Sequence, residues 1–387
     1  MISPKRLLLD AAACCLLANL PSALAQGSLT PPGPPAPTMK SLDQLQPRTP
    51  ISALPFTITN RGSYFLAANL TGVSGQNGIT INTNDVFLDL NGFALVGGGG
   101  GSIAIYAPNL VTNLSVAGGT IRNWDGGGVI AFGSFSARVE TVLLTQNGGA
   151  GGVRLGNGSF VSHCSATGNS APPIWLLGSG IVSDCVVHEN PATGIVIGSG
   201  CTVKDCVAFF NNGLGVSSGD GCSLLHCTVY QNSTNGIAVG YASTVLECVS
   251  YGNTGLGIVA ADGGIVKNCV VRGNQAGGIS IGSEATVSGC DISRNSNNGL
   301  SIGSTCRIVD NAIILNGSSG ILNATNAIRS RIDGNMVNAN TTGMTVYNSL
   351  IIRNSVGGNS TSFAGTGNDI GPTSSGAATS TSPWANF

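Results

Sequence analysis

Two rows of chemically active side chains recur at intervals of 21 residues in the middle of this 387-residue chain. The first row carries imidazoles and carboxylates: His163, Asp184, Asp205, His226 and Glu247. The second row carries mostly aromatic side chains: His188, Phe209, Tyr230, Tyr251 and Arg272. Carboxylates can hydrogen-bond hydroxyl groups or hold Ca²⁺, and aromatic rings offer flat apolar faces to sugar rings. Together the two rows would suit an extended sugar chain.

These residues form our candidate site. We expect a ligand to be bound by His188, Phe209, Tyr230, Tyr251, Arg272 and His226. Asp184 and Asp205, one repeat apart, would repel each other unless a cation lies between them, so Ca²⁺ is a possible cofactor. The alternative is that the aromatic side chains only stabilise one another, because aromatic residues fit β surfaces in any case. The residues alone leave both interpretations open.

Catalysis is a further possibility. Two acids on neighbouring repeats satisfy the minimal geometry for glycoside hydrolysis, and a lyase needs clustered acids with a basic proton acceptor. The candidate catalytic residues are Asp184, Asp205, Lys204 and Glu247.

The spacing of both rows follows from a regular repeat over residues 153–322. The repeat is marked by cysteine at seven positions: Cys164, Cys185, Cys206, Cys227, Cys248, Cys269 and Cys290. Asparagine recurs with the same interval from Asn169 to Asn316, and Asn311 takes the position after the last cysteine. A repeat this strict predicts a solenoid, in which each unit buries its apolar face only against its neighbours.

The residues within one unit predict an all-β solenoid. Apolar positions alternate over three or four residues, as at Ile195 and Ile197, which is the period of a strand. Three short strands per unit, separated by Gly, Ser and Asn bends, would form one coil of a parallel β-helix with coils about 4.8 Å apart. Strand starts from Ile79 to Met344 give about 13 coils.

Two other solenoid architectures are alternatives for this repeat. The run from Val203 through Cys206 and Ala208 to Asn211 matches the leucine-rich repeat pattern, but a second strand occupies the place of that repeat's helix. A left-handed hexapeptide helix needs a coil length divisible by six, and 21 is not.

The chain divides into four parts by composition. Residues 1–25 are typical of a signal peptide, with Lys5 and Arg6 before an apolar run and a small-residue cleavage site near Ala25. Residues 26–50 are a Pro-rich spacer. We expect the β-helix over 51–354, with an N-terminal cap and first coil at 51–97, and a Gly/Ser/Thr-rich tail over 355–387.

Composition bounds the location and partners. Only 9% of residues are charged and the net charge is −1, so no nucleic-acid footprint or polybasic membrane patch is present. No later segment is apolar enough to span a bilayer. We therefore expect a secreted monomer, extracellular or periplasmic, that is soluble or peripherally attached.

The twelve cysteines of an exported chain would ordinarily suggest disulfides. Cys14 and Cys15 belong to the signal peptide, and Cys201, Cys222 and Cys306 share a second column. Stacked coils hold Cβ atoms about 4.8 Å apart, slightly more than the roughly 3.5–4.5 Å of a disulfide. We interpret most of the cysteines as buried free thiols, with some disulfides or a metal-binding ladder as alternatives.

Several stretches resemble a known group of proteins. They are Gly62-Ser63-Tyr64, Gly78-Ile79-Thr80-Ile81, Leu88-Asp89-Leu90-Asn91-Gly92-Phe93, the repeats, and Pro383-Trp384-Ala385-Asn386-Phe387. They look like bacterial secreted right-handed parallel β-helix proteins of the pectin-lyase-like group, in lineages such as Planctomycetes and Verrucomicrobia. The resemblance covers nearly all of the mature chain and implies an architecture more than a reaction.

The same resemblance bears on function. β-Helix galacturonases share an Asn-Thr-Asp strand, an Asp-Asp pair, a Gly-His-Gly turn and an Arg-Ile-Lys run, which this chain lacks; Asn82-Thr83-Asn84-Asp85 is only a near match. We therefore expect a polysaccharide-binding or surface structural module whose partner is a polysaccharide or a cell-envelope glycan. The alternative is a polysaccharide lyase or glycoside hydrolase.

Overall fold

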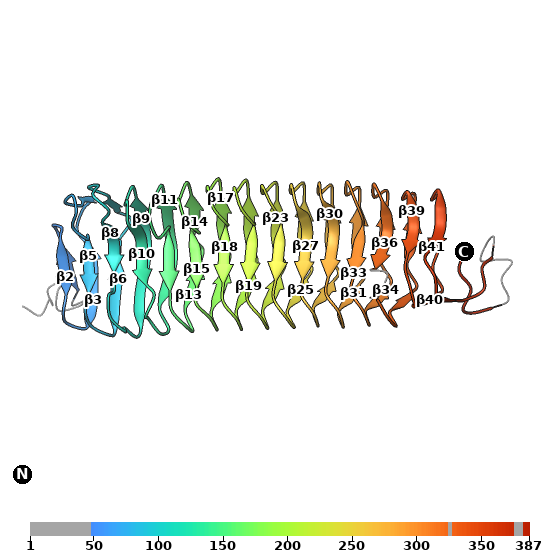
Figure 1. The fold of residues 1–387 in the computed structure, drawn as a ribbon. Coiled ribbons are helices and arrows are strands. Elements are labelled where there is room, and N and C mark those ends of the chain that lie inside the picture. Colours follow the sequence, from blue (N-terminus) through green and yellow to red (C-terminus); the bar gives the residue numbers. More distant parts are fainter. Residues whose placement is uncertain (1–47, 324–326, 375–381) are drawn as a thin grey trace, which may run out of the picture. The chain divides into compact units, whose positions relative to one another are not determined.

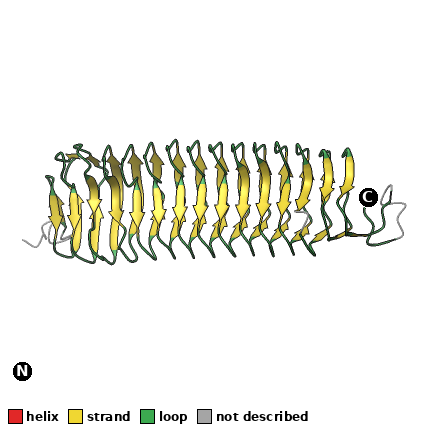
Figure 2. Ribbon diagram, in the orientation of Figure 1, coloured by secondary structure: helices red, strands yellow, loops and turns green. Residues whose placement is uncertain are grey.

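The computed structural model describes residues 48–323, 327–374 and 382–387. The expected signal peptide, and the spacer up to residue 47, lie outside these ranges. Within them, all regular secondary structure is β-strand, as Figure 2 shows. The strands repeat in coils that stack side by side along one axis (Figure 1).

Each coil contributes one strand to a 15-stranded parallel sheet. The strands of this sheet are β2 (Phe56–Ile58), β5 (Ile79–Ile81), β8 (Ile103–Tyr106), β10 (Gly127–Ala131), β12 (Val153–Leu155), β15 (Ile174–Leu176), β18 (Ile195–Ile197), β21 (Val216–Ser218), β24 (Ile237–Val239), β27 (Leu256–Ala260), β30 (Gly277–Ile281), β33 (Leu300–Ile302), β36 (Ser319–Asn323), β39 (Thr342–Thr345) and β41 (Thr361–Ala364).

The remaining strands form a 27-stranded sheet with two arms that meet at a bend. The first arm contains β1 (Thr49–Ile51), β3 (Gly62–Leu66), β6 (Val86–Asp89), β13 (Phe160–Ser162), β16 (Ile181–Ser183), β19 (Thr202–Lys204), β22 (Ser223–Leu225), β25 (Thr244–Leu246), β28 (Ile265–Lys267), β31 (Thr286–Ser288), β34 (Arg307–Val309), β37 (Arg331–Asp333), β40 (Leu350–Ile352) and β42 (Asp369–Ile370). The second arm contains β4 (Leu70–Thr71), β7 (Ala94–Val96), β14 (Ser165–Thr167), β17 (Val186–His188), β20 (Val207–Phe209), β23 (Thr228–Tyr230), β26 (Val249–Tyr251), β29 (Val270–Arg272), β32 (Asp291–Ser293), β35 (Ala312–Ile314) and β38 (Met336–Asn338). β9 (Leu114–Arg122) and β11 (Arg138–Thr145) run through both arms.

The register confirms the parallel solenoid expected from the repeat. Ile195 pairs with Val216 and Val207 pairs with Thr228, each 21 residues further along the chain. Side chains alternate across every strand, so that β18 buries Ile195 and Ile197 and turns Val196 outward. The buried side chains of all coils join into one continuous apolar core.

Three bends close each coil, and each bend has the same two-residue construction. A residue in the left-handed region turns the chain, and the next side chain points inward. In the coil that begins at Ile195 the left-handed residues are Gly200, Asp205 and Phe210, with φ of 68°, 54° and 51°. The inward residues that follow are Cys201, Cys206 and Asn211, all of which are buried.

The inward asparagines form a continuous ladder of hydrogen bonds. The backbone N–H and the side-chain Nδ2 of Asn211 both donate to Oδ1 of Asn232, each at 3.1 Å. Nδ2 of Asn211 also donates to the carbonyl of Val187 at 3.1 Å. The same pattern repeats at Asn232, Asn253 and Asn274. Each asparagine therefore satisfies backbone groups that a bend would otherwise leave buried and unpaired.

The cysteine column occupies the equivalent place at the bend between the two arms. Sγ of Cys206 lies 3.2 Å from the carbonyl of Lys204 and 3.8 Å from that of Val182, as weak donor contacts. All ten described cysteines are buried and free, in agreement with the sequence interpretation. The neighbouring thiols of Cys164 and Cys206, together with burial, raise the pKa of Cys185. Burial also raises the pKa of Cys201 and Cys306.

The stack is longer than the 13 coils counted from the sequence, because the 15-stranded sheet has one more strand at each end. Phe56–Ile58 pairs in register with Ile79–Ile81, so part of the expected cap is a full coil. Within the expected tail, Phe363 pairs with Met344 and Asp369 pairs with Leu350. Alternation over three residues was too short to separate these strands from loops by sequence.

The last coils are closed by residues far along the chain. Asn386, 32 residues further along the chain, continues the asparagine ladder beyond Asn354. Its Oδ1 accepts from the Asn354 N–H at 3.0 Å. Nearby, the buried carboxylate of Asp333 is held by Arg353 and Arg331. Hydrogen bonds from Arg353, and then from Arg331, keep the pKa of Asp333 below its usual range despite burial.

The asparagine ladder gives a first testable prediction. Asn232→Ala should remove the acceptor for two N–H groups of Asn211 and so destabilise the fold by about 1–3 kcal/mol for each donor left unsatisfied. The measurement is the free energy of unfolding in urea. The matched control is Asn212→Ala at an exposed position of the same bend, which should change it by less than about 0.5 kcal/mol. Equal losses in the two variants would contradict the ladder's role.

The thiols give a second prediction. Because all ten described cysteines are buried, and burial also raises the pKa of Cys201 and Cys306, the native protein should react only slowly with a thiol-specific disulfide reagent. Raising the pH from about 7 to about 9 should leave the native rate low, although an ordinary thiol ionises near pH 8.5. All described cysteines should react after unfolding in guanidinium. Rapid labelling of the folded protein would show that the columns open.

Candidate functional site

The two predicted rows lie on the outward side of the second arm, over four neighbouring coils. We call this surface the three-row face, because a third row separates the two that the sequence singled out. The bend row is Asp184, Asp205, His226 and Glu247. The valine row is Val186, Val207, Thr228 and Val249, and the aromatic row is His188, Phe209, Tyr230 and Tyr251.

Strand alternation places these rows. In β20 the central residue Ala208 is buried, so Val207 and Phe209 on either side of it point outward. Each bend-row residue adopts φ between 52° and 55° and precedes a buried cysteine. The valine and aromatic rows lie about 6.7 Å apart across the arm, and successive coils lie about 4.8 Å apart along it.

The bend row contains a chain of polar contacts rather than separate charges. Nδ1 of His226 lies 3.4 Å from Oδ1 of Asp205, and Nε2 lies 3.1 Å from Oε2 of Glu247. The three side chains are about half exposed, at 46–53%. Both imidazole nitrogens therefore face carboxylates.

Two other candidate catalytic residues, Asp184 and Lys204, stand apart from this chain of contacts. Asp184 lies one coil before Asp205, and Lys204 ends β19 with an exposed side chain. Neither side chain makes an ion pair with another residue that the structure describes. The structure thus brings together three of the predicted bend-row residues and leaves Asp184 and Lys204 separate.

The aromatic row is a stack of parallel rings. The centroids of His188 and Phe209 are 4.9 Å apart, and those of Phe209, Tyr230 and Tyr251 follow at 4.8 Å intervals. The ring planes differ by only 3–8°. Each inner ring therefore has both faces covered by its neighbours, and ring edges point outward. The faces that the sequence analysis assigned to sugar rings are occupied within the stack.

The surroundings of the stack involve Tyr230 within it and two adjoining residues, Phe210 and Arg272. Partial burial, and then the nearby Tyr251, raise the pKa of Tyr230, so its phenol remains a hydrogen-bond donor at neutral pH. Phe210, 49% exposed, lies edge-on to Phe209 at 5.5 Å and to Tyr230 at 6.2 Å. The sequence analysis missed Phe210, although its place after Phe209 was visible. Arg272 continues the row as the strand partner of Tyr251.

A hollow of about 510 Å³ lies at the start of the same face. Three glycines are among the residues that line this hollow: Gly92, Gly118 and Gly119. His163, the first residue of the predicted imidazole and carboxylate row, lines it together with Leu143 and Ser165. Thus His163 belongs to the hollow and not to the chain of contacts around His226.

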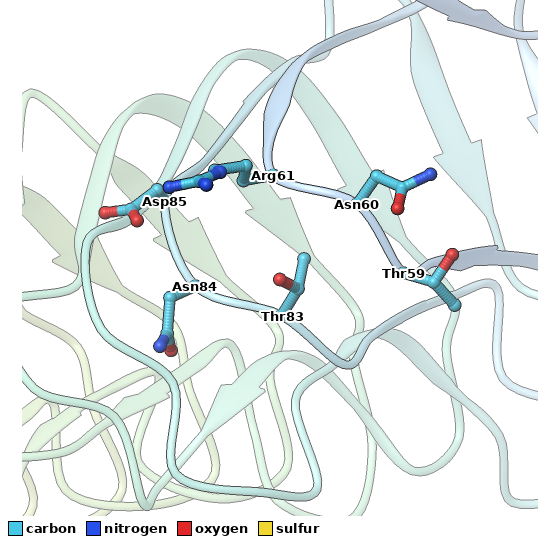
Figure 3. Close-up of a pocket in the computed structure, with 6 residues that line it drawn as sticks. All are labelled: Thr59, Asn60, Arg61, Thr83, Asn84 and Asp85. Carbon is cyan, nitrogen blue, oxygen red and sulfur yellow. The ribbon is translucent and has the colours of Figure 1, made fainter.

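A second pocket, of about 390 Å³, lies between the first two coils (Figure 3). Figure 3 shows the Arg61 side chain extending toward the turn that carries Asp85. Oδ1 of Asn84 accepts from the Thr112 N–H at 2.9 Å, and Asp85 accepts from Asn113 at 2.8 Å. Asn84 and Asp85, which belong to the near match to the galacturonase sequence, are thus hydrogen-bonded to the turn at Thr112 and Asn113.

Two negative findings concern the described residues only. No three of their His, Cys, Asp and Glu side chains converge in a way that could hold a metal ion. Over the same ranges the structure has no helix that could cross a membrane. Calcium binding at Asp184 and Asp205 is thus left as an expectation.

Comparison with solved structures finds several chains with similarity to this one. The periplasmic alginate epimerase AlgG shares 13% identity over 72% of this chain and 73% of its own, with a TM-score of 0.39. A mannuronan C-5 epimerase A-module of Azotobacter vinelandii shares 13% identity over 84% of this chain and 90% of its own, with a TM-score of 0.43. At these identities the likeness concerns the fold alone. Comparison with curated proteins gave no match.

The family comparison is more direct. The model of the right-handed β-helix region matches residues 109–254 and again residues 212–361, which together span most of the solenoid described above. The parallel coils described above agree with this match. The chain therefore belongs to the right-handed β-helix family.

Proposed function

We propose that this protein is an exported polysaccharide-binding module, and that an extended, uncharged glycan lies along the stack over the three-row face. The observation that carries the proposal is the order of the rows. Over four consecutive coils, a row of three valines and one threonine is flanked on one side by carboxylates and an imidazole. On the other side it is flanked by stacked ring edges, two of which carry phenol groups.

The valine row supplies the apolar contact that the stacked rings cannot give. Val186 is 39% exposed and Val207 is partly exposed. A sugar ring lying on this row would have one hydroxyl edge toward the bend row and the other toward the aromatic row, which is about 6.7 Å away. Carboxylates accept hydrogen bonds from hydroxyl groups, and phenols donate to them.

The charges of the face favour an uncharged ligand. Asp184, Asp205 and Glu247 would repel an anionic chain, unless Ca²⁺ bridged the two sets of carboxylates. Asp184 and Asp205 are the residues that we propose for such a bridge, as the sequence analysis expected. Added Ca²⁺ therefore belongs in the binding assay.

Binding without turnover fits the contacts better than catalysis. The His226 nitrogens face Asp205 and Glu247, and all three side chains are about half exposed on an open surface. Enzymes usually carry out such chemistry in a closed site that excludes water, whereas this surface is open. The self-stacked rings also give the face a structural role, because stacked aromatic pairs stabilise by about 0.5–1.5 kcal/mol beyond their burial.

The location of the protein is part of the same proposal. Residues 1–25 would direct export, with cleavage near Ala25, and the Pro-rich residues that follow would form the N-terminal part of the mature chain. An extracellular or periplasmic monomer would then meet cell-envelope or environmental polysaccharides.

The test removes hydroxyl and carboxylate groups while keeping the shape of each side chain. Tyr230→Phe with Tyr251→Phe, and separately Asp205→Asn with Glu247→Gln, should each weaken binding of a neutral hexasaccharide roughly tenfold, because each neutral hydrogen bond contributes about 0.5–1.5 kcal/mol. Calorimetric titration with cellohexaose, xylohexaose and mannohexaose, with Ca²⁺ and with chelator, gives the affinities. A parallel assay for released products gives turnover.

Tyr241→Phe with Glu284→Gln is the matched control, because both residues are exposed and lie at a different bend. This variant should bind as the wild type does. Equal losses in the control, or no binding of any neutral hexasaccharide by the wild type, would overturn the proposal. Product release that is lost in Asp205→Asn with Glu247→Gln would replace binding by catalysis.

A further inference from the structure

A second cluster lies on the 15-stranded sheet, away from the three-row face. Arg154 is the central, outward residue of β12, and Trp175 occupies the same position one coil later in β15. The Arg154 guanidinium carbon is 3.7 Å from the centroid of a Trp175 ring and 5.7 Å from that of Phe132. Phe132 in turn meets Trp175 edge-on at 6.1 Å.

Four arginines of the described chain stack on aromatic rings, and comparison among them isolates Arg154. The other three each have a carboxylate partner: Arg48 has Asp89 at 2.8 Å, Arg138 has Glu140 at 3.6 Å, and Arg353 has Asp333 at 2.5 Å. Arg154 has none among the residues that the structure describes. Its guanidinium is a stacked cation that lacks a counter-charge.

The Arg154 side chain also has an unsatisfied polar atom. Its Nε is buried without a hydrogen-bond partner, one of only two such side-chain atoms in the described ranges. Burial lowers the pKa of Arg154. A partly desolvated cation beside aromatic rings gains most from an oxyanion, because a guanidinium presents a planar fork of donors that matches carboxylate or sulfate.

The surroundings offer apolar contact for the rest of a ligand. Phe132 is 43% exposed and Leu177, just after β15, is 40% exposed. Beyond Trp175 the outward row continues with the smaller Val196 and Ser217. A sugar held by its anionic group at Arg154 would therefore find exposed apolar surface beside it.

We propose that Arg154, Trp175 and Phe132 form a binding site for an acidic polysaccharide, in which the guanidinium receives a carboxylate or sulfate group of the sugar. This site shares no residue with the three-row face, and the proposal does not depend on the function proposed for that face. The two surfaces differ in charge and prefer different ligands: uncharged glycan on the face with Asp205 and Glu247, and anionic glycan on the sheet with Arg154.

The test uses three hexasaccharides with one backbone: cellohexaose, its C6-oxidised glucuronate counterpart, and its sulfate ester. Arg154→Gln should weaken binding of the glucuronate and sulfate forms about ten- to hundredfold, because a charge-assisted hydrogen bond contributes about 1.5–3 kcal/mol and each 1.4 kcal/mol is tenfold. Binding of cellohexaose should not change. The anionic binding of the wild type should also weaken as salt rises.

Arg138→Gln is the matched control, because it removes an arginine that likewise stacks on an aromatic ring but has Glu140 as its partner. It should leave anionic binding unchanged. Arg154→Lys retains the charge and serves if Arg154→Gln fails to fold; it should still bind roughly tenfold more weakly than the wild type, since an ammonium lacks the planar fork.

Several outcomes would overturn the proposal. One is an equal loss of anionic hexasaccharide binding in Arg138→Gln and Arg154→Gln. Another is an affinity of Arg154→Lys for these ligands that equals that of the wild type. A third is a wild type that does not prefer the charged hexasaccharides over cellohexaose. Free sulfate or glucuronate monomer that binds as tightly as the hexasaccharide would also overturn it, because the sugar chain would then contribute nothing. Failure of the phenylalanine variants on the three-row face would leave this result unaffected.

Discussion

The structure depends on how its corners satisfy the backbone. A parallel sheet pairs its strands, but three sharp bends per coil interrupt the pairing and leave N–H groups pointing into a dry interior. Along the asparagine ladder, and at some of the other bends, an inward polar side chain from the following coil accepts from the bend's backbone N–H. Asn232 accepts from the Asn211 N–H, Ser243 accepts from the Cys222 N–H at 3.0 Å, and Asn335 accepts from the Asn311 N–H at 3.0 Å. An unmet buried donor costs about 1–3 kcal/mol, so these contacts decide which bends are tolerated.

This constraint also explains where functional side chains can be displayed. The residue before each inward rung must adopt a left-handed conformation, and its side chain is free to vary because it does not enter the core. Asp205, His226 and Glu247 occupy that position on successive coils. The constant register then aligns them without further contacts, and it aligns the outward residues of β20, β23 and β26 in the same way. A binding surface several coils long follows from the repeat itself.

Much of this organisation could be predicted from sequence. The 21-residue interval predicted the stacking register, and the alternation of Ile195 and Ile197 predicted their burial. The position of Cys206 before an alternating pair predicted an inward thiol, and the fixed spacing predicted that Phe209, Tyr230 and Tyr251 stand in one row. These inferences succeed because in a solenoid equal spacing in sequence means proximity in space.

Other features depend on information that spacing does not contain. Ring orientation is set by side-chain torsions, so the sequence could not show that Tyr230 has both faces covered. Asn386 reaches its place above Asn354 across 32 residues, outside any repeat interval. Arg154 and Trp175 are one interval apart, but the significance of Arg154 lies in a missing carboxylate, and that is apparent only when the ion pairs of Arg48, Arg138 and Arg353 are known.

The central claim is that a glycan lies along the coils rather than across them. The most direct test is the affinity of a neutral oligosaccharide series, from two to eight units, measured by calorimetric titration. The account predicts that affinity rises with each added unit until the chain covers the four coils from Asp184 to Glu247, and then stays constant. A disaccharide that binds as tightly as a hexasaccharide would contradict it, because a single coil would then hold the whole ligand.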